Sequence, residues 1–61
     1  MALPLLDIKQ AAEYLNISHH TLYKLLERKA VPAAKIGGSW RFAPEMLDEW
    51  VKKKMEESIE S

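Results

Sequence analysis

The chain has 61 residues, of which 48% are hydrophobic and 30% charged, with nine basic and nine acidic side chains and no cysteine. This composition is typical of a small globular domain, and it excludes disulfide bonds, thiolate metal sites and a largely disordered chain. A chain of this length forms one domain at most, which we expect over residues 1–61. No apolar run approaches the roughly 20 residues of a membrane span, and we expect the chain in the cytoplasm.

The charges are distributed unevenly although they sum to zero. Residues 1–44 carry six basic and three acidic side chains, whereas residues 45–61 carry three basic and six acidic ones. Such an asymmetry indicates one face for an anionic partner and a second segment that faces solvent or another protein.

The first predicted helix covers about residues 8–15. Asp7 is suited to cap it, and Gln10, three residues later, completes a capping box. Asn16 tolerates the left-handed conformation that ends a helix. The apolar residues recur at helical spacing: Ile8, Ala11, Ala12 and Leu15. The two alanines are small, so another helix can approach closely there.

The second predicted helix covers about residues 19–29. Ser18 is a good N-cap, and Pro32 prevents the helix from continuing. Its buried face is formed by Leu22, Leu25 and Leu26. The polar residues of this helix must therefore point largely away from the core.

A hairpin is predicted over about residues 33–42, with Gly37-Gly38-Ser39 as its turn. With a three-residue turn, Ile36, Trp40 and Phe42 share the inner face, and Lys35 and Arg41 point outward. Trp40 is then a core residue rather than a wedge between bases.

A third helix is predicted over about residues 44–57, with Pro44 in its first turn and the last residues of the chain frayed. Its apolar stripe consists of Leu47, Trp50, Val51 and Met55. We expect Tyr14 and Trp50 to be core or staple residues rather than ligand contacts. The fold class is thus mostly α with a small β-hairpin, in the order helix, helix, hairpin, helix.

Two short helices joined by three residues, with small side chains where they cross, describe a helix-turn-helix. In that motif the outward side chains of the second helix reach base edges in the major groove of DNA. The hairpin then forms a wing that carries a second basic contact, through Lys35 and Arg41.

Five segments, "AAEYLNIS", "TLYKLL", "VPAAKIGG", "WRF" and "LDEWV", together resemble the excisionase-type members of the MerR-like winged helix-turn-helix domains. The resemblance spans about residues 5–51. It implies a small protein of phage, mobile-element or regulatory origin that binds double-stranded DNA and is not an enzyme. Such excisionases bend DNA and help an integrase, and their relatives regulate transcription.

The resemblance also implies which residues contact DNA. They are Ser18, His19, His20, Thr21, Tyr23, Lys24 and Glu27 or Arg28 on the second helix, and Lys35, Ser39 and Arg41 on the wing. The expected partners are DNA, an integrase or the transcription machinery, and further copies of the chain on DNA. No cofactor is expected.

Three other interpretations stand beside this one. A metal at His19 and His20 is disfavoured, because neighbouring helical residues diverge by about 100° and no cysteine is present. An enzyme is disfavoured because no nucleophile, base and orienting acid can be recognised. A protein–protein module is the main alternative, in which the C-terminal helix docks an integrase, a polymerase subunit or another copy.

Overall fold

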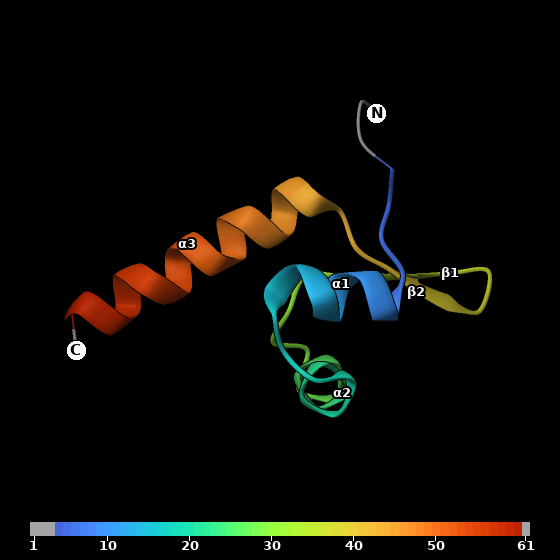
Figure 1. Ribbon diagram of the computed structural model, residues 1–61, viewed down its shortest axis with the longest axis horizontal. Helices are drawn as coiled ribbons and strands as arrows, with labels where there is room; N and C mark the ends of the chain where they lie inside the picture. The colour runs from blue at the N-terminus through green and yellow to red at the C-terminus, as the bar shows by residue number, and fades with distance from the viewer. Residues whose placement is uncertain (1–3, 61) are drawn as a thin grey trace.

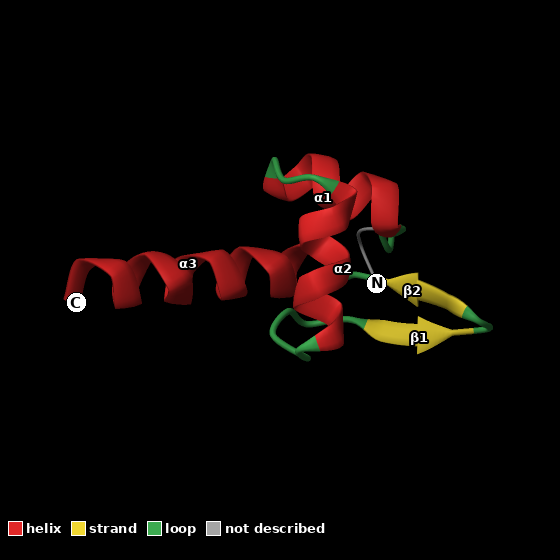
Figure 2. Cartoon of the chain, turned by 90° about the horizontal axis from the view of Figure 1, so that it is seen from below, coloured by secondary structure: helices red, strands yellow, loops and turns green. Residues whose placement is uncertain are grey.

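The structure is a computed structural model that describes residues 4–60, so residues 1–3 and 61 of the expected single domain lie outside it. The described elements follow the predicted order. They are α1 (Ile8–Leu15), α2 (His19–Glu27), β1 (Ala34–Ile36), β2 (Ser39–Arg41) and α3 (Pro44–Glu60). The expected fold class, three helices and a two-stranded antiparallel hairpin, is thereby confirmed. The hairpin and α3 extend in opposite directions from α1 and α2 (Figures 1 and 2).

Local signals in the sequence set both ends of α1. The Asp7 side chain accepts a hydrogen bond from the Gln10 backbone at 2.8 Å, and the Gln10 side chain accepts one from the Asp7 backbone at 3.0 Å. This is the predicted capping box. At the other end Asn16 has φ 59°, and the Ile17 N–H donates to the Ala12 carbonyl. The left-handed residue therefore turns the chain sharply into α2.

The helix α2 begins as predicted and ends two residues earlier than expected. The Ser18 hydroxyl accepts a hydrogen bond from the Thr21 N–H at 3.1 Å, which caps the helix. Lys29 has φ 55°, and the Ala30 N–H donates to the Leu25 carbonyl. A left-handed residue with this bond forms a Schellman stop, so the helix ends before Pro32 can interfere.

The core is small and lies where the two helices, the wing and the start of α3 meet. Ala11 and Ala12 are fully buried, as expected for a close helix crossing. The largest fully buried side chains are Phe42, Leu22 and Leu47. Other side chains pack around this cluster: Leu6, Ile8, Leu15, Ile17, Leu25, Ala33, Trp40 and Trp50.

The predicted assignment of the wing's two faces is wrong in part. The turn consists of Gly37 and Gly38 alone, so Ile36 pairs with Ser39 and Lys35 pairs with Trp40. Cross-strand partners lie on the same face of a sheet, and a shift of one residue moves every side chain to the other face. Lys35 therefore lies over the Trp40 ring, 5.5 Å from its centre, and Ile36 is 55% exposed.

One prediction for α3 needs correction, and the two roles expected of Tyr14 in α1 are narrowed to one. The helix α3 continues to Glu60 instead of fraying, because residues 45–60 contain no Gly or Pro and Lys54 pairs with Glu57 at 3.6 Å. Tyr14 is not a core residue but is about half exposed, and its hydroxyl donates a 2.5 Å hydrogen bond to Asp48. Trp50, by contrast, is half-buried against the core, as expected.

No helix within residues 4–60 is long and apolar enough to span a bilayer.

Candidate nucleic-acid interface

The outward side of α2 carries two rows of polar side chains. His19 and Tyr23 form the row nearer the wing, while His20 and Lys24 form the outer row, each pair four residues apart. All four side chains are exposed, and Tyr23 retains about half of its possible surface. Nothing within residues 4–60 covers this side of α2, because Leu22 and Leu26 hold the opposite side in the core.

The two remaining polar positions at the start of α2 have a structural role. The Ser18 hydroxyl caps the helix and also donates a 2.9 Å hydrogen bond to the Thr21 hydroxyl. Both residues are exposed. Their mutual hydrogen bonds fix the first turn of α2, and this holds the neighbouring histidines in place.

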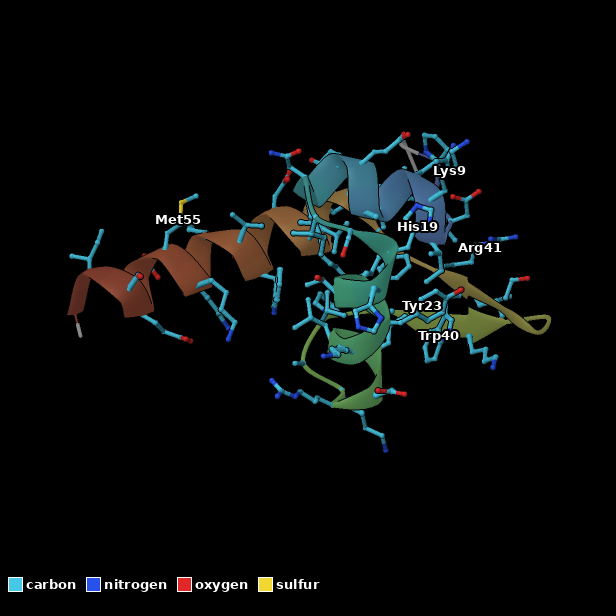
Figure 3. All side chains as sticks on the ribbon, turned by 60° about the horizontal axis from the view of Figure 1, so that its bottom comes forward. Lys9, His19, Tyr23, Trp40, Arg41 and Met55 are labelled. Carbon is cyan, nitrogen blue, oxygen red and sulfur yellow. The ribbon has the colours of Figure 1, made fainter. Side chains whose placement is uncertain are left out.

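A hollow of about 480 Å³ lies between the start of α1, the wing-side row of α2 and the second strand of the wing. Four predicted residues line it: His19, Tyr23, Ser39 and Arg41. The hollow thus brings together residues of α2 and β2, which are separated in the sequence by β1 and the turns on either side of it. Figure 3 shows His19, Tyr23 and Arg41 on the same side of the molecule.

Arg41 borders this hollow and also a second one beside Ala34 and Ile36. It is half-buried, and its guanidinium Nη1 donates a 3.3 Å hydrogen bond to the Trp40 carbonyl. Its strand position places it opposite Ala34, on the other face from Lys35. The predicted pairing of Lys35 and Arg41 on one outer face is therefore wrong, although both remain accessible at the surface.

Other predicted residues lie outside the hollow. His20, Thr21 and Lys24 lie on the side of α2 away from the wing, and Arg28 follows α2 as its C-cap. All are exposed. The predicted set is therefore divided between a hollow at the wing and an open ridge along α2, and a double helix is large enough to contact both.

Lys9 belongs to this surface although the sequence did not single it out. It lies in the first turn of α1 and lines the hollow together with His19 and Arg41 (Figure 3). The Leu6 and Phe42 backbones exchange hydrogen bonds of 2.8 and 2.9 Å, and this bridge brings the start of α1 beside the wing. Nothing in the local sequence indicates this contact, because 36 positions separate the two residues.

The charge of the surface comes from cations on three elements. Lys9 contributes from α1, Lys24 and Arg28 from α2 and its cap, and Arg41 from the wing. Lys35 lies on the other face of the wing, and the exposed Glu27 of α2 adds one opposing charge. The carboxylate of Asp7, also at the hollow, is engaged in capping α1. Clustered cations on an open ridge beside a wing attract a polyanion and suit phosphate contacts.

Comparison with known protein families bears on this surface. A model of the family described as "Helix-turn-helix domain" matches residues 5–55. The chain has no significant match among curated proteins or solved structures. The matched region contains α1, α2, the wing and 12 of the 17 residues of α3, and DNA binding is the general activity that such a domain supports. The chain thus belongs to the helix-turn-helix domain family.

Proposed function

We propose that this chain binds double-stranded DNA in a sequence-directed manner, with α2 in the major groove and the wing against the adjacent backbone. The observation that supports this most directly is the uncovered ridge of α2, where His20 and Lys24 are exposed next to a hollow lined by Arg41. Side chains on such a ridge can reach base edges, while cations at the wing contact phosphates.

Each residue type on this surface suits a part of that task. Lys24 and Arg28 lie four residues apart and can follow one strand of the backbone. The histidines and Thr21 are short polar groups at the start of α2, the end that enters the groove in helix-turn-helix complexes. Tyr23 can pack its ring on the wing side while its hydroxyl reaches a phosphate.

Within DNA binding, we propose the role of an excisionase-like architectural factor or a small transcriptional regulator, acting in the cytoplasm. The order and spacing of the five sequence segments support it. An integrase or the transcription machinery is then the protein partner. The proposed activity is non-enzymatic: the surface offers positioned cations and hydrogen-bonding groups, which are suited to binding.

The test is a titration with duplex DNA at several salt concentrations, with Lys24→Ala and Arg41→Ala as the variants. We expect each variant to weaken binding about tenfold, the value of one charge-assisted hydrogen bond. Each should also reduce the slope of log affinity against log salt concentration by about 0.9, since one phosphate is no longer neutralised.

The matched control is Lys53→Ala, which removes the same charge from an exposed position on α3, away from the hollow. It should bind as the parent does. If Lys24→Ala and Arg41→Ala also bind like the parent, or if the control is equally weakened, the proposed surface is wrong. A footprint on native DNA then tests whether binding is sequence-directed.

A second candidate function is a protein–protein module that uses α3. It is favoured by the exposure of Met55 and Ile59 on the part of α3 that projects from the core. The two functions separate in a residue-resolved spectrum recorded with duplex DNA. Shifts on α2 and the wing support DNA binding, whereas shifts confined to residues 45–60 support the module.

A further inference from the structure

A second hollow lies beside β1 and has a volume of about 300 Å³. Its lining is mostly apolar and comes from three segments: Leu5 before α1, Pro32, Ala34 and Ile36 in and before β1, and Met46 in α3. Two further alanines and Arg41 complete it. The hollow beside α2 takes its wing residues from positions 38–41 instead. The second hollow, called the apolar hollow below, is therefore a separate surface that shares only Arg41 with the first.

The apolar hollow brings together exposed side chains that are more commonly scattered. Among residues 4–60, seven large hydrophobic side chains are exposed, and three of them line this hollow. Leu5 is 39% exposed, and Ile36 and Met46 are each 55% exposed. Single exposed apolar side chains are common on protein surfaces, whereas a group of them marks a binding site. A ligand with an apolar body would remove this surface from water, which is favourable.

Arg41 is the one charged residue in the lining of the apolar hollow. No ion pair of its guanidinium is recorded within residues 4–60, and its one side-chain hydrogen bond, of 3.3 Å, goes to the Trp40 carbonyl. A guanidinium carries five N–H donors, so most of them are available to a ligand. Two donors of an arginine can bind the two oxygens of a carboxylate side by side. The polar group that suits this hollow is therefore a carboxylate.

We infer that the apolar hollow binds a small carboxylic acid, whose apolar body contacts Ile36 and Met46 and whose carboxylate pairs with Arg41. Sites for small molecules combine a mostly apolar lining with a few placed polar groups, and their volumes begin at about 300 Å³. The size of this hollow thus suits a short alkyl chain or a single ring. An amine on the same body would meet the positive charge of Arg41, so the charge of the ligand decides whether it binds.

The position of Arg41 gives this site a consequence for DNA binding, and this step alone rests on the proposed function. Arg41 also lines the hollow beside α2, with His19 and Tyr23. A carboxylate paired with Arg41 neutralises one of the cations that are expected to contact phosphate. The acid therefore weakens DNA binding, and DNA weakens binding of the acid by the same factor.

Binding of the acid is tested first without DNA, in a residue-resolved spectrum titrated with sodium octanoate. We expect saturable shifts at Leu5, Ile36, Met46 and Arg41, and no shifts over residues 52–59 of α3. Two matched ligands separate the contributions of the chain and the charge. Acetate has the carboxylate without the alkyl chain, and octylamine has the chain with the opposite charge. Each should bind more weakly by about tenfold or more.

The outcomes that contradict the inference are distinct. Octylamine binding as tightly as octanoate would show that Arg41 does not select the ligand. Acetate binding as tightly would show that the apolar lining is not used. Either result would overturn the inference. An absence of octanoate shifts would overturn it as well, and would leave the apolar hollow to a segment of a partner protein.

Substitutions locate the ligand within the hollow. Met46→Gln replaces an apolar lining side chain with a polar one of similar length and should weaken octanoate binding about fivefold. Met55→Gln is the matched control and should bind as the parent does, since Met55 is 63% exposed but lies on the part of α3 remote from the wing (Figure 3). Arg41→Gln should abolish the preference for octanoate over octylamine. Equal weakening by the two methionine variants would overturn the inference.

The effect on DNA is tested by a titration with duplex DNA at a saturating concentration of octanoate, with sodium acetate at the same concentration as the control for ionic strength. We expect octanoate to weaken DNA binding of the parent about tenfold and to have no effect on the Arg41→Ala chain. Octanoate that occupies the hollow without weakening DNA binding would overturn the coupling. A chain that binds octanoate but no DNA would overturn the coupling and the proposed function together, while the site for the acid would stand.

Discussion

The indole Nε1 of Trp50 donates a 2.7 Å hydrogen bond to the backbone carbonyl of Ala30, directly after the left-handed residue Lys29. This bond joins α3 to the end of α2. The carbonyl lies just past the helix, where no intrahelical N–H is available to it. One side chain thereby fixes the position of the third helix relative to the proposed DNA-binding surface.

We predict that Trp50→Phe retains the fold but lowers its stability. Phenylalanine keeps most of the apolar contact and removes the donor, at a cost of about 1 kcal/mol. In a domain of this size, that cost lowers Tm by about 4–8 °C. Thermal unfolding followed by circular dichroism measures the change. DNA affinity at a temperature well below Tm should not change, because Trp50 does not line the hollow at the wing. A Tm equal to that of the parent would show that the bond contributes nothing.

A second hydrogen bond joins α3 to α1 and makes the stability of the fold depend on pH in the alkaline range. The Tyr14 hydroxyl donates to the Asp48 carboxylate, and this hydrogen bond, followed by desolvation and by the charge of Asp48, raises the pKa of Tyr14 above its ordinary value of 10.0. The stabilisation from this bond is therefore fully present below pH 10, the pKa of tyrosine in the unfolded chain. It is lost as pH rises through the higher pKa that Tyr14 has in the folded chain.

The measurement is thermal stability at pH 8 and at several points above pH 10, for the parent and for Tyr14→Phe. We expect the parent to lose stability over the alkaline range and the variant to lose less. Tyr23→Phe is a suitable control, since Tyr23 is exposed to a similar extent but no hydrogen bond of its hydroxyl is recorded among the described residues. If the two variants show the same alkaline profile, the Tyr14–Asp48 bond does not contribute.

Signals within a few residues of one another predicted the structure well. The caps of α1 and α2 depend on side chains that bond three positions along the chain, and Asp7, Gln10 and Ser18 occupy those positions. The small residues Ala11 and Ala12 mark the helix crossing for a similar reason, because their size alone decides how closely two helices approach. Residue type and spacing were sufficient in each case.

Long-range features could not be read in the same way. Three small residues were available for the turn, and only the strand pairing decides that Ser39 belongs to β2. The Leu6–Phe42 bridge, which brings Lys9 to the hollow, joins segments with no pattern in common. The candidate site on α2 was therefore predictable from one helix, whereas its boundary on α1 and the wing depended on tertiary contacts.

The turn of the wing yields a third prediction. Gly37 and Gly38 have φ values of 60° and 85°, as a two-residue loop between right-twisted strands requires. Apart from the adjacent residues in the chain, no atom of residues 4–60 lies within 4 Å of where a side chain would begin at either position, so a substitution is penalised by the backbone alone. We expect Gly38→Val to cost about 1–2 kcal/mol and Gly37→Asn much less, since asparagine tolerates this conformation.

Thermal unfolding of the two variants measures this difference, and DNA titration measures its effect on the site. Gly38→Val should also weaken DNA binding, because Ser39 and Arg41 take their positions from the strand that follows the turn. Equal stability of the two variants would indicate that the turn does not constrain the wing.

The last prediction concerns Lys9, which only the tertiary structure places beside the proposed DNA-binding surface. Lys9→Ala should weaken DNA binding and lower the salt dependence by about 0.9 logarithmic unit, as expected for the loss of one phosphate contact. Lysine and alanine both favour helices, so α1 should remain intact. Its capping box does not involve this residue.

The variant with the same loss of charge on α3, Lys53→Ala, again serves as the control. If Lys9→Ala reduces affinity without changing the salt dependence, Lys9 acts by supporting the fold of the hollow. If the affinity and its salt dependence are both reduced, the start of α1 lies against the DNA backbone. The contact surface then extends from α2 across the hollow to the first turn of α1.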